Sequence, residues 1–441
     1  MRLVIVIPDC GEGGLFQFYN MLVPALAREA EVHCVFASPT HSPLEPRIEG
    51  AICHRLAPEA AAQSLAQLLS GPLALAPQLA RSLAVAHQAW AFARSLAPDC
   101  IELCDWPLSA IPGALDGSVP LVVQSHGAMG QIARHDPVRG GELGTALVQL
   151  IEAQVIGRAQ QIQTYSRANA AWWAETTRRD VAMIRPAFPL PEPTAPATPS
   201  ARMGIFGRLQ SWKGPQVLCD ALALLGEAAP GCDWYGAAKP WPDSNEPADA
   251  RLARAFPSVW NRAFQFHGPI DRIDVARRMA ASRAVIVPST WDVFNFTAVE
   301  AMAVARPVIV SSGAGASELI VHGVNGFTFP AGDAAALAAA LEAAAALSDS
   351  AARAMGEAAR ATVGQELDPD RIAAQRLAAY RSAVADHSPT PAPDWLRDLL
   401  VPGAPTRWRM EDFLATLPVR PLARAVAERI TGKLPGKRGR R

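Results

Sequence analysis

Residues 287–312 read VPSTWDVFNFTAVEAMAVARPVIVSS and contain, in succession, the end of a strand, a polar loop, a helix and a further strand. The apolar runs that end at Pro288 and begin at Pro307 are typical of buried strands, and a helix is expected to begin near Thr297 between them. A strand, a helix and another strand in this order form the repeating unit of a parallel sheet. The stretch therefore predicts an α/β fold.

The same alternation of short apolar runs and helical patterns continues in both directions along the chain. Before residue 187 the predicted strands are RLVIVIP (2–8), EVHCVFA (31–37), CIELC (100–104), PLVVQS (120–125), QIQTYS (161–166) and VAMIRP (181–186). After residue 201 they are RMGIFG (202–207), CDWYGA (232–237), AFQFHG (263–268), AVIVPS (284–289), PVIVSS (307–312) and GFTFP (326–330). The pattern predicts two open, doubly wound parallel sheets.

Residues 187–201 separate these two sets of strands. The segment holds five prolines and shows no periodicity, which is typical of an interdomain linker. We therefore expect Rossmann-like domains at 1–186 and 202–366, facing each other across a cleft. The predicted remainder is a helix within 367–387 that packs back on the first domain, followed by a Pro-rich and then basic extension at 388–441.

Composition excludes several classes of protein. Lys plus Arg and Asp plus Glu both number 41, so no overall charge draws the chain to nucleic acid. No apolar run reaches the roughly 18 residues of a membrane span, and the first run is too short for a signal peptide. The seven cysteines show no paired spacing for zinc or disulfides, which favours a reducing cytoplasm.

Candidate ligand-binding residues lie where predicted strands end. Gly13 and Gly14 lead into a helix whose free N–H groups favour anions, although glycines at such turns also serve tight packing. His126 lies where a strand opens into a glycine-containing loop, whereas most single histidines are structural. Arg208 and Lys213 flank one strand end and can bracket a diphosphate; a solvated turn would explain either residue alone.

The loop and helix of residues 287–312 carry the densest set of polar groups. Asp292 and Asn295 lie in the loop, and Glu300 is expected in the first turn of the helix. The two carboxylates can accept hydrogen bonds from sugar hydroxyls, although an acid in a first turn also simply complements the helix dipole. The N–H groups expected to receive a phosphate belong to Phe296, Thr297 and Ala298.

Together these residues resemble the family 4 glycosyltransferases, which are retaining enzymes of the GT-B fold. The resemblance covers the chain to about residue 386. It rests on GGLFQFYNMLVPALA (13–27), GRLQSWKG (207–214), GPIDRIDVARRMAASRAVIVPS (268–289), WDVFNFTAVEAMAVARPVIVSSGAGASELI (291–320) and GVNGFTFPAGD (323–333).

The resemblance implies transfer of a hexose-like unit from a nucleotide-diphosphate-sugar donor to an acceptor hydroxyl on a glycan, a lipid-linked compound or a small molecule. It implies that Arg208 and Lys213 bind the donor diphosphate and that Glu300 holds the ribose. Asp292 would touch the donor sugar. It also places Gly13 and Gly14 in a loop facing the phosphates and His126 in the acceptor-side catalytic cleft.

GT-B enzymes are generally metal-independent, so the resemblance implies neither a metal nor another cofactor. The one D-x-D sequence, at 368–370, is better explained as a helix start capped by Asp368, with Pro369 in its first turn.

Four positions depart from the family pattern. Asp292 is one methylene shorter than the usual Glu, and Gly is usual at the positions of Asn295, Ala305 and Ala314. The donor sugar is therefore left open. Two alternatives remain, namely another GT-B enzyme such as an epimerase or a phosphorylase, and an inactive protein that binds nucleotide sugars or acts as a scaffold.

The C-terminal segment 420–441 carries eight basic residues and one acid. Leu422, Val426 and Ile430 recur every four residues and form a short apolar stripe. One interpretation is a helix that lies on the anionic inner face of the cell membrane, where a lipid-linked acceptor would be found. The other is a solvated, disordered end, because two glycines and a proline interrupt the stripe.

Overall fold

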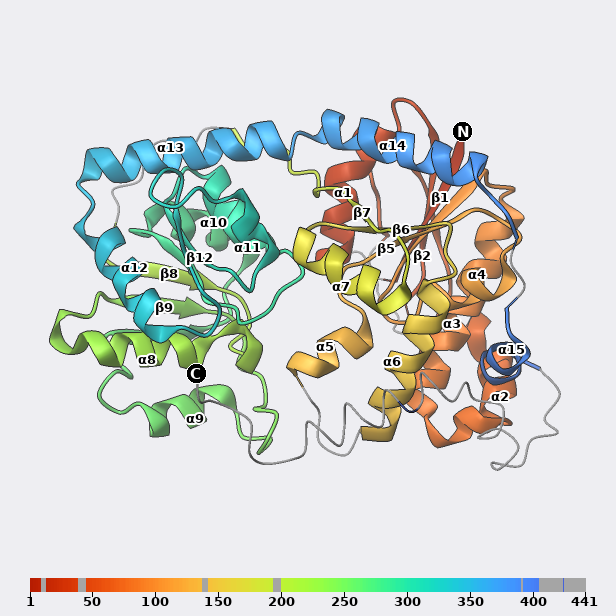
Figure 1. Cartoon of the computed structure of the whole chain (residues 1–441), viewed down its shortest axis with the longest axis horizontal. Coiled ribbons are helices and arrows are strands. Elements are labelled where there is room, and N and C mark those ends of the chain that lie inside the picture. Colours follow the sequence, from red (N-terminus) through yellow and green to blue (C-terminus); the bar gives the residue numbers. More distant parts are fainter. Residues whose placement is uncertain are drawn as a thin grey trace.

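The structure is a computed structural model that describes residues 1–8, 13–38, 45–136, 142–192, 200–389, 392–403 and 423. It contains two parallel sheets, one in each half of the chain, with helices packed around them (Figure 1). This is the doubly wound α/β architecture that the sequence predicts. Apart from residue 423, the basic segment 420–441 lies outside the described residues, so both interpretations of it stay predictions.

The first sheet has seven strands in the order β3-β2-β1-β4-β5-β6-β7, and all its pairings are parallel. The strands are β1 (Arg2–Ile7), β2 (Glu31–Phe36), β3 (Ile52–Arg55), β4 (Cys100–Cys104), β5 (Leu121–Gln124), β6 (Gln161–Thr164) and β7 (Ala182–Met183). The sequence predicts all of them except β3. That edge strand was missed because its four residues, ICHR, are partly exposed and form no apolar run.

The second sheet has six parallel strands in the order β10-β9-β8-β11-β12-β13. They are β8 (Met203–Phe206), β9 (Cys232–Tyr235), β10 (Phe264–Gly268), β11 (Val285–Val287), β12 (Val308–Ser311) and β13 (Phe327–Phe329). All six coincide with predicted strands. Their central members are apolar and buried, as expected for strands covered on both faces.

Helices follow most strands and cover the sheets. Those before residue 187 are α1 (Gly14–Leu26), α2 (Ala62–Leu69), α3 (Pro77–Ser95), α4 (Ile111–Asp116), α5 (Met129–His135), α6 (Glu142–Ile156) and α7 (Arg167–Thr177). Those after residue 201 are α8 (Pro215–Leu225), α9 (Ala248–Ala255), α10 (Arg272–Ala281), α11 (Phe296–Ala303), α12 (Ala334–Ala346), α13 (Asp349–Glu366), α14 (Pro369–Ala385) and α15 (Asp394–Leu400). Short 3₁₀ helices are η1 (Pro58–Ala61), η2 (Pro72–Leu75), η3 (Ser211–Lys213), η4 (Gly226–Ala228) and η5 (Gly315–Leu319).

No single helix in the described part of the chain is long and apolar enough to cross a membrane. Among the described residues, one pair, α12 with the stretch Asp349–Ala385, has the necessary length and composition, and the two are bent by 114° at their junction. The apolar residues Leu337 and Leu341 of α12 are fully buried in the core of the C-terminal domain.

The last long helices connect the two halves of the molecule. In Figure 1, α13 runs above the C-terminal domain and α14 continues above the N-terminal domain. Asp368 caps α14 by accepting a hydrogen bond from the Arg371 N–H at 2.9 Å, and Pro369 is its first residue, which confirms that the D-x-D sequence begins a helix. The helix α14 packs against α1, β4 and β5, so it belongs structurally to the N-terminal domain.

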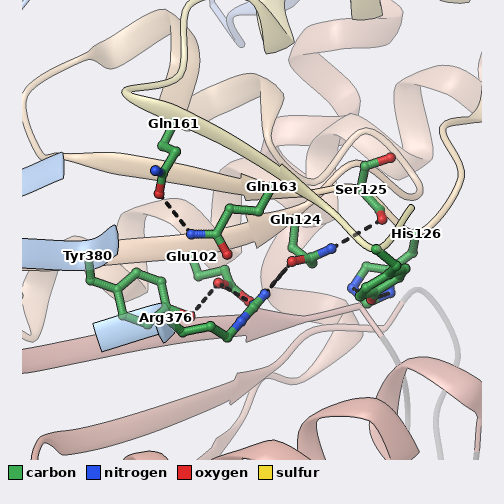
Figure 2. Close-up of polar contacts among 9 residues, drawn as sticks. Glu102, Gln124, Ser125, His126, Gln161, Gln163, Arg376 and Tyr380 are labelled. Carbon is green, nitrogen blue, oxygen red and sulfur yellow. Dashed lines mark hydrogen bonds and ion pairs between the residues drawn. The ribbon is translucent and has the colours of Figure 1, made fainter. Parts of the chain in front are cut away.

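A buried charge cluster fixes α14 on the first sheet (Figure 2). The side chains of Arg376 on α14 and Glu102 on β4 are only 2% and 0% exposed, and Arg376 Nη1 lies 3.4 Å from Glu102 Oε2. Arg376 also donates to Gln124 Oε1 on β5, and the Tyr380 hydroxyl donates to Glu102 Oε2 at 2.6 Å. The Arg376 guanidinium stacks over the Phe18 ring of α1. Removing one member of such a cluster leaves a buried charge without its partner.

We expect the Arg376→Met substitution to lower the free energy of unfolding by about 3–5 kcal/mol, because Glu102 would keep its charge in a buried site. Urea unfolding of the purified protein measures this loss. Arg371→Met is the matched control, since Arg371 on the same helix forms an exposed ion pair with Glu366. Equal stability of the two variants would contradict a structural role for the cluster.

Candidate functional site

A pocket of about 510 Å³, called the main pocket because predicted site residues line it, lies between the two domains. Gly13 and Gly14 border it at the start of α1, and Phe296, Thr297 and Glu300 border it from α11. Its other lining residues are Gln17, Met21, Phe188, Pro191, Phe206, Gly207, Arg272, Val275, Ala276, Met279, Ala303 and Val304. The structure thus brings five predicted site residues, from segments almost 300 positions apart, to one pocket.

Lys213 and Asp292 form the central charged contact of the site. Lys213 Nζ lies 2.5 Å from Asp292 Oδ2, and Asn295 Nδ2 donates to the same oxygen at 2.9 Å. The side chains of Lys213 and Asp292 are only 19% and 15% exposed, so the pair is weakly screened by water. The ammonium also lies over the Trp212 ring, 4.5 Å from its centroid. One face of Lys213 is therefore fixed by the protein.

Close approach of two loops produces this contact. Gly214 has φ of +77°, and a Cβ there would lie 1.9 Å from the Pro288 carbonyl oxygen, so only glycine fits between η3 and the end of β11. The Thr290 N–H donates to the Trp212 carbonyl at 2.9 Å and ties the same two loops together. The backbone thereby holds Lys213 beside Asp292.

Asn295 begins α11 with φ of +84°, a left-handed conformation that asparagine tolerates better than most residues. This explains why asparagine can replace the usual glycine. Its side-chain oxygen accepts from the Ala298 N–H at 3.3 Å. The expectation that Ala298 receives a phosphate is therefore corrected, because its N–H is already used by the helix cap. The N–H groups of Phe296 and Thr297 have no hydrogen-bond partner among the described residues.

Arg208 is exposed two residues after the end of β8, and its side chain makes no hydrogen bond or ion pair within the described part of the chain. Arg208, Lys213, Asn295 and Thr297 line a small recess of about 50 Å³ next to the main pocket. Phe206, Gly207 and Thr297 line both spaces, so the recess adjoins the main pocket. Arg208 and Lys213, the two residues predicted to bind a diphosphate, thus lie at the same strand end. The side chain of Lys213 is held by Asp292, whereas that of Arg208 has no such partner among the described residues.

Glu300 lies on α11 at the side of the main pocket. The helix begins at Phe296, so Glu300 is in its second turn rather than the expected first turn. Burial raises the pKa of this carboxyl, and the positive charge of Arg272 opposes the rise. Because Glu300 is beyond the N–H groups of the first turn, complementing the helix dipole does not explain its position. Its carboxylate is available to a ligand in the pocket.

His126 lies two residues after the end of β5, but it borders neither the main pocket nor the recess. Its ring packs edge-on against Phe18, and its Nδ1 lies 2.5 Å from the Tyr165 hydroxyl. Burial, with a smaller contribution from the charge of Arg376, lowers the pKa of His126 to about 3. The imidazole is therefore neutral at pH 7. Tyr165 in turn contacts Phe294 and Phe296, which connects His126 to the donor-side loop.

Asp105, which the sequence analysis missed, fixes the loop of His126. One carboxylate oxygen accepts from the His126 N–H at 2.9 Å, and the other accepts from the Ser125 hydroxyl at 2.8 Å and the Gly127 N–H at 3.2 Å. Burial raises its pKa to about 6 despite these hydrogen bonds. The available signal was an acid directly after the apolar strand β4, at the sheet edge where parallel α/β folds bind ligands.

Comparison with known proteins finds a family match within the second half of the chain. Residues 200–346 match the family described as glycosyl transferases group 1, and this range runs from before β8 to the end of α12. Within the C-terminal domain, this range is similar to the group 1 glycosyltransferases. The expected family resemblance is thereby confirmed where its most specific motifs lie.

Two relatives show how far the sequence similarity extends. The chain is 33% identical over 133 residues to D-inositol 3-phosphate glycosyltransferase of Jonesia denitrificans, which covers 28% of this chain and 30% of that protein. It is 27% identical over 303 residues to glycogen synthase of Mycobacterium tuberculosis, which covers 66% and 70%. The first match thus spans less than a third of the relative.

Solved structures show that the two-domain fold of the chain is GT-B. Sucrose-phosphate synthase from Thermosynechococcus elongatus superposes with a TM-score of 0.65 at 20% identity, covering 87% of this chain and 99% of that one. Alr3699/HepE of Anabaena, in complex with UDP-glucose, gives a TM-score of 0.59 at 20% identity, covering 86% and 100%. The expected two-domain GT-B architecture is confirmed.

The pKa of Asp105 predicts how stability depends on pH. Its folded-state pKa of about 6 exceeds the ordinary value of about 4, so between pH 6 and 4 the folded protein holds a proton that the unfolded chain has lost. The stability of the wild type relative to Asp105→Asn should therefore rise by about 2 kcal/mol as the pH falls from 7 to 4.

Urea unfolding of both proteins across this pH range measures the difference. The control is Asp180→Asn, at an exposed acid of the same domain. A constant difference between wild type and Asp105→Asn would contradict the raised pKa.

Proposed function

We propose that the chain is a retaining glycosyltransferase that moves a hexose-like unit from a nucleotide-diphosphate-sugar donor to an acceptor hydroxyl. The observation that carries the proposal is the Lys213–Asp292 contact beside the interdomain pocket, in the range that is similar to the group 1 glycosyltransferases. The similarly folded Alr3699/HepE, which was solved in complex with UDP-glucose, supports a donor of this class.

In this proposal the donor nucleotide occupies the main pocket. Glu300 accepts hydrogen bonds from the ribose hydroxyls, because its carboxylate lies at the pocket and has no partner in the first helical turn. The diphosphate lies at the recess, where Arg208 supplies a planar guanidinium and Lys213 a point charge. The N–H groups of Phe296 and Thr297 face the same anion from the start of α11, and Gly13 and Gly14 leave room for it from the opposite domain.

The donor sugar is proposed to lie beside Asp292. Asn295 and Lys213 both contact Asp292 Oδ2, so this carboxylate is oriented before the substrate arrives. The side chain is shorter than the glutamate usual in the resembling family. Donor preference is therefore expected to depend on this position more than on the nucleotide contacts.

Catalysis in this proposal rests on stabilising negative charge on the departing diphosphate. Arg208, Lys213 and the N-terminus of α11 are positioned for this task, and they take the role of a metal cation, so the reaction is proposed to be metal-independent. No side chain is assigned as a nucleophile; the acceptor attacks from the side of the leaving group, and the diphosphate accepts its proton. With a pKa of about 3, His126 acts as a neutral hydrogen-bonding group rather than as a charged acid.

The proposal predicts that Arg208→Ala and Lys213→Ala each lower kcat/KM for the donor by about 10- to 150-fold, the equivalent of about 1.5–3 kcal/mol for a hydrogen bond to a charged group. Release of nucleoside diphosphate in the presence of acceptors measures transfer, after a thermal-shift screen of UDP, GDP and ADP sugars has identified the donor. Arg262→Ala, at an exposed arginine of the same domain, is the control. Donor binding without transfer or hydrolysis in the wild type would favour an inactive binding protein.

The division between nucleotide and sugar contacts predicts opposite effects at two acids. Asp292→Glu should change donor-sugar preference or rate while leaving the affinity for free nucleoside diphosphate unchanged. Glu300→Ala should weaken that affinity, because the ribose loses its acceptor. Isothermal titration of both variants with the nucleoside diphosphate provides the measurement, and equal losses of affinity would disprove the separation.

A further inference from the structure

The short helix α5 of the N-terminal domain is fixed at its beginning by two buried carboxylates. Asp105 accepts from the N–H groups of His126 and Gly127, in the loop that leads into the helix. Glu152 on α6 accepts from the Gly130 N–H at 2.8 Å, within the first turn of α5. Both carboxylates are buried, so these contacts are shielded from water. The other end of α5 therefore has a defined position.

That other end reaches the C-terminal domain. The Ser211 hydroxyl donates to Asp136 Oδ1 at 3.3 Å, and the Gln210 side-chain amide donates to Asp136 Oδ2. The ring of His135 stacks on Trp291 with a centroid distance of 4.4 Å and an interplanar angle of 3°. Two consecutive residues of the N-terminal domain, His135 and Asp136, thus contact two separate loops of the C-terminal domain.

The two loops are those that carry the charged pair of the site. Gln210 and Ser211 directly precede Trp212 and Lys213, while Trp291 directly precedes Asp292. The Trp291 and Trp212 rings lie 5.3 Å apart, and the Lys213 ammonium lies over Trp212. Contacts therefore run without a break from the end of α5 to both members of the Lys213–Asp292 pair.

We propose that His135 and Asp136 are positioning residues that set the Lys213–Asp292 pair from the opposite domain. Asp136 holds the backbone on one side of Lys213, and His135 holds the Trp291 ring on the other. Burial and the charge of Arg134 lower the pKa of His135, so its ring stacks on the tryptophan in the neutral form. The arrangement makes the geometry of the donor-side pair depend on contact between the two domains.

This assignment relies on the proposed function only for what the pair binds; the contacts themselves do not depend on it. The first test therefore needs neither substrate nor activity. Hydrogen–deuterium exchange of the full-length protein is followed in the peptides covering 208–214 and 289–295. Exchange in both should be about tenfold faster in Asp136→Ala and His135→Ala than in the wild type, because each substitution releases a loop from its cross-domain contact.

Glu59→Ala is the matched control, since Glu59 is an exposed acid of the same domain whose side chain makes no hydrogen bond or ion pair among the described residues. Thermal unfolding of every variant shows whether it is folded. Exchange in Asp136→Ala equal to that in Glu59→Ala would overturn the proposal. Faster exchange spread over the whole chain would also overturn it, because that outcome is loss of stability rather than release of these loops.

The second test measures transfer with the donor identified above. Asp136→Ala and Gln210→Ala should each lower kcat/KM by about tenfold. The double variant should lose no more activity than the less active of the two single variants, because both substitutions remove the same hydrogen bond between Gln210 and Asp136. Asp136→Asn should recover part of the activity, since its amide oxygen still accepts from Gln210. The proposal would be overturned if the losses of the two single variants multiply in the double variant and Asp136→Asn recovers no activity. A wild type that neither binds nor transfers the donor would instead disprove the proposed function, and the exchange measurement would still decide the positioning role.

Discussion

The ion pair between Arg376 and Glu102 holds α14, the helix that continues from the C-terminal domain, on the sheet of the N-terminal domain. A fully buried carboxylate in a central strand is costly unless a cation reaches it, and here the cation comes from the last long helix. The preceding helix α13 packs on α11 of the other domain, so α13 and α14 span both halves. The linker runs beside this bridge: the Phe188 N–H donates to the Leu367 carbonyl at 2.8 Å, and Arg360 donates to the Pro191 carbonyl at 2.6 Å.

Besides the helices α13 and α14 and the linker, further polar contacts join the two domains beside the cleft. Glu318 on η5 accepts from the Arg167 N–H at the start of α7, at 2.8 Å, and pairs with Arg185 at 3.0 Å. The Ser166 hydroxyl donates to the Val293 carbonyl, one residue after Asp292. The loop with the site's carboxylate is thus contacted from the N-terminal domain by Tyr165, Ser166 and His135. The geometry of the site therefore depends on contacts between the two domains and not on either sheet alone.

The sequence predicted the fold well because its strands are continuous apolar runs, and a strand buried on both faces cannot be built otherwise. The exception, β3, contains His54 and Arg55 at a sheet edge. Site residues could be predicted where glycines and charges follow a strand, as at Lys213 and Asp292. Asp105 was missed because an isolated acid after a strand is indistinguishable from a solvated one until the loop that donates to it is in place.

Contacts between distant segments are even harder to predict from the sequence than the role of Asp105. Arg376 lies in an amphipathic helix rich in charge, where an arginine would ordinarily be exposed, and only the packing of α14 shows that it is buried. His135 and Asp136 form an ordinary helix end; their partners lie about 155 and 75 positions further along the chain, respectively. Periodicity describes the elements, whereas such pairings depend on how the elements are assembled.

The N-terminal domain is not a continuous stretch of chain, and this has a consequence for synthesis. Glu102 leaves the ribosome some 270 residues before Arg376 and Tyr380, the two residues that neutralise and hydrogen-bond it. During that interval β4 must either keep its carboxylate in water or bury it protonated. The C-terminal sheet, whose strands all lie between residues 203 and 329, can close first. The domain whose synthesis begins first is therefore the one whose folding is completed last.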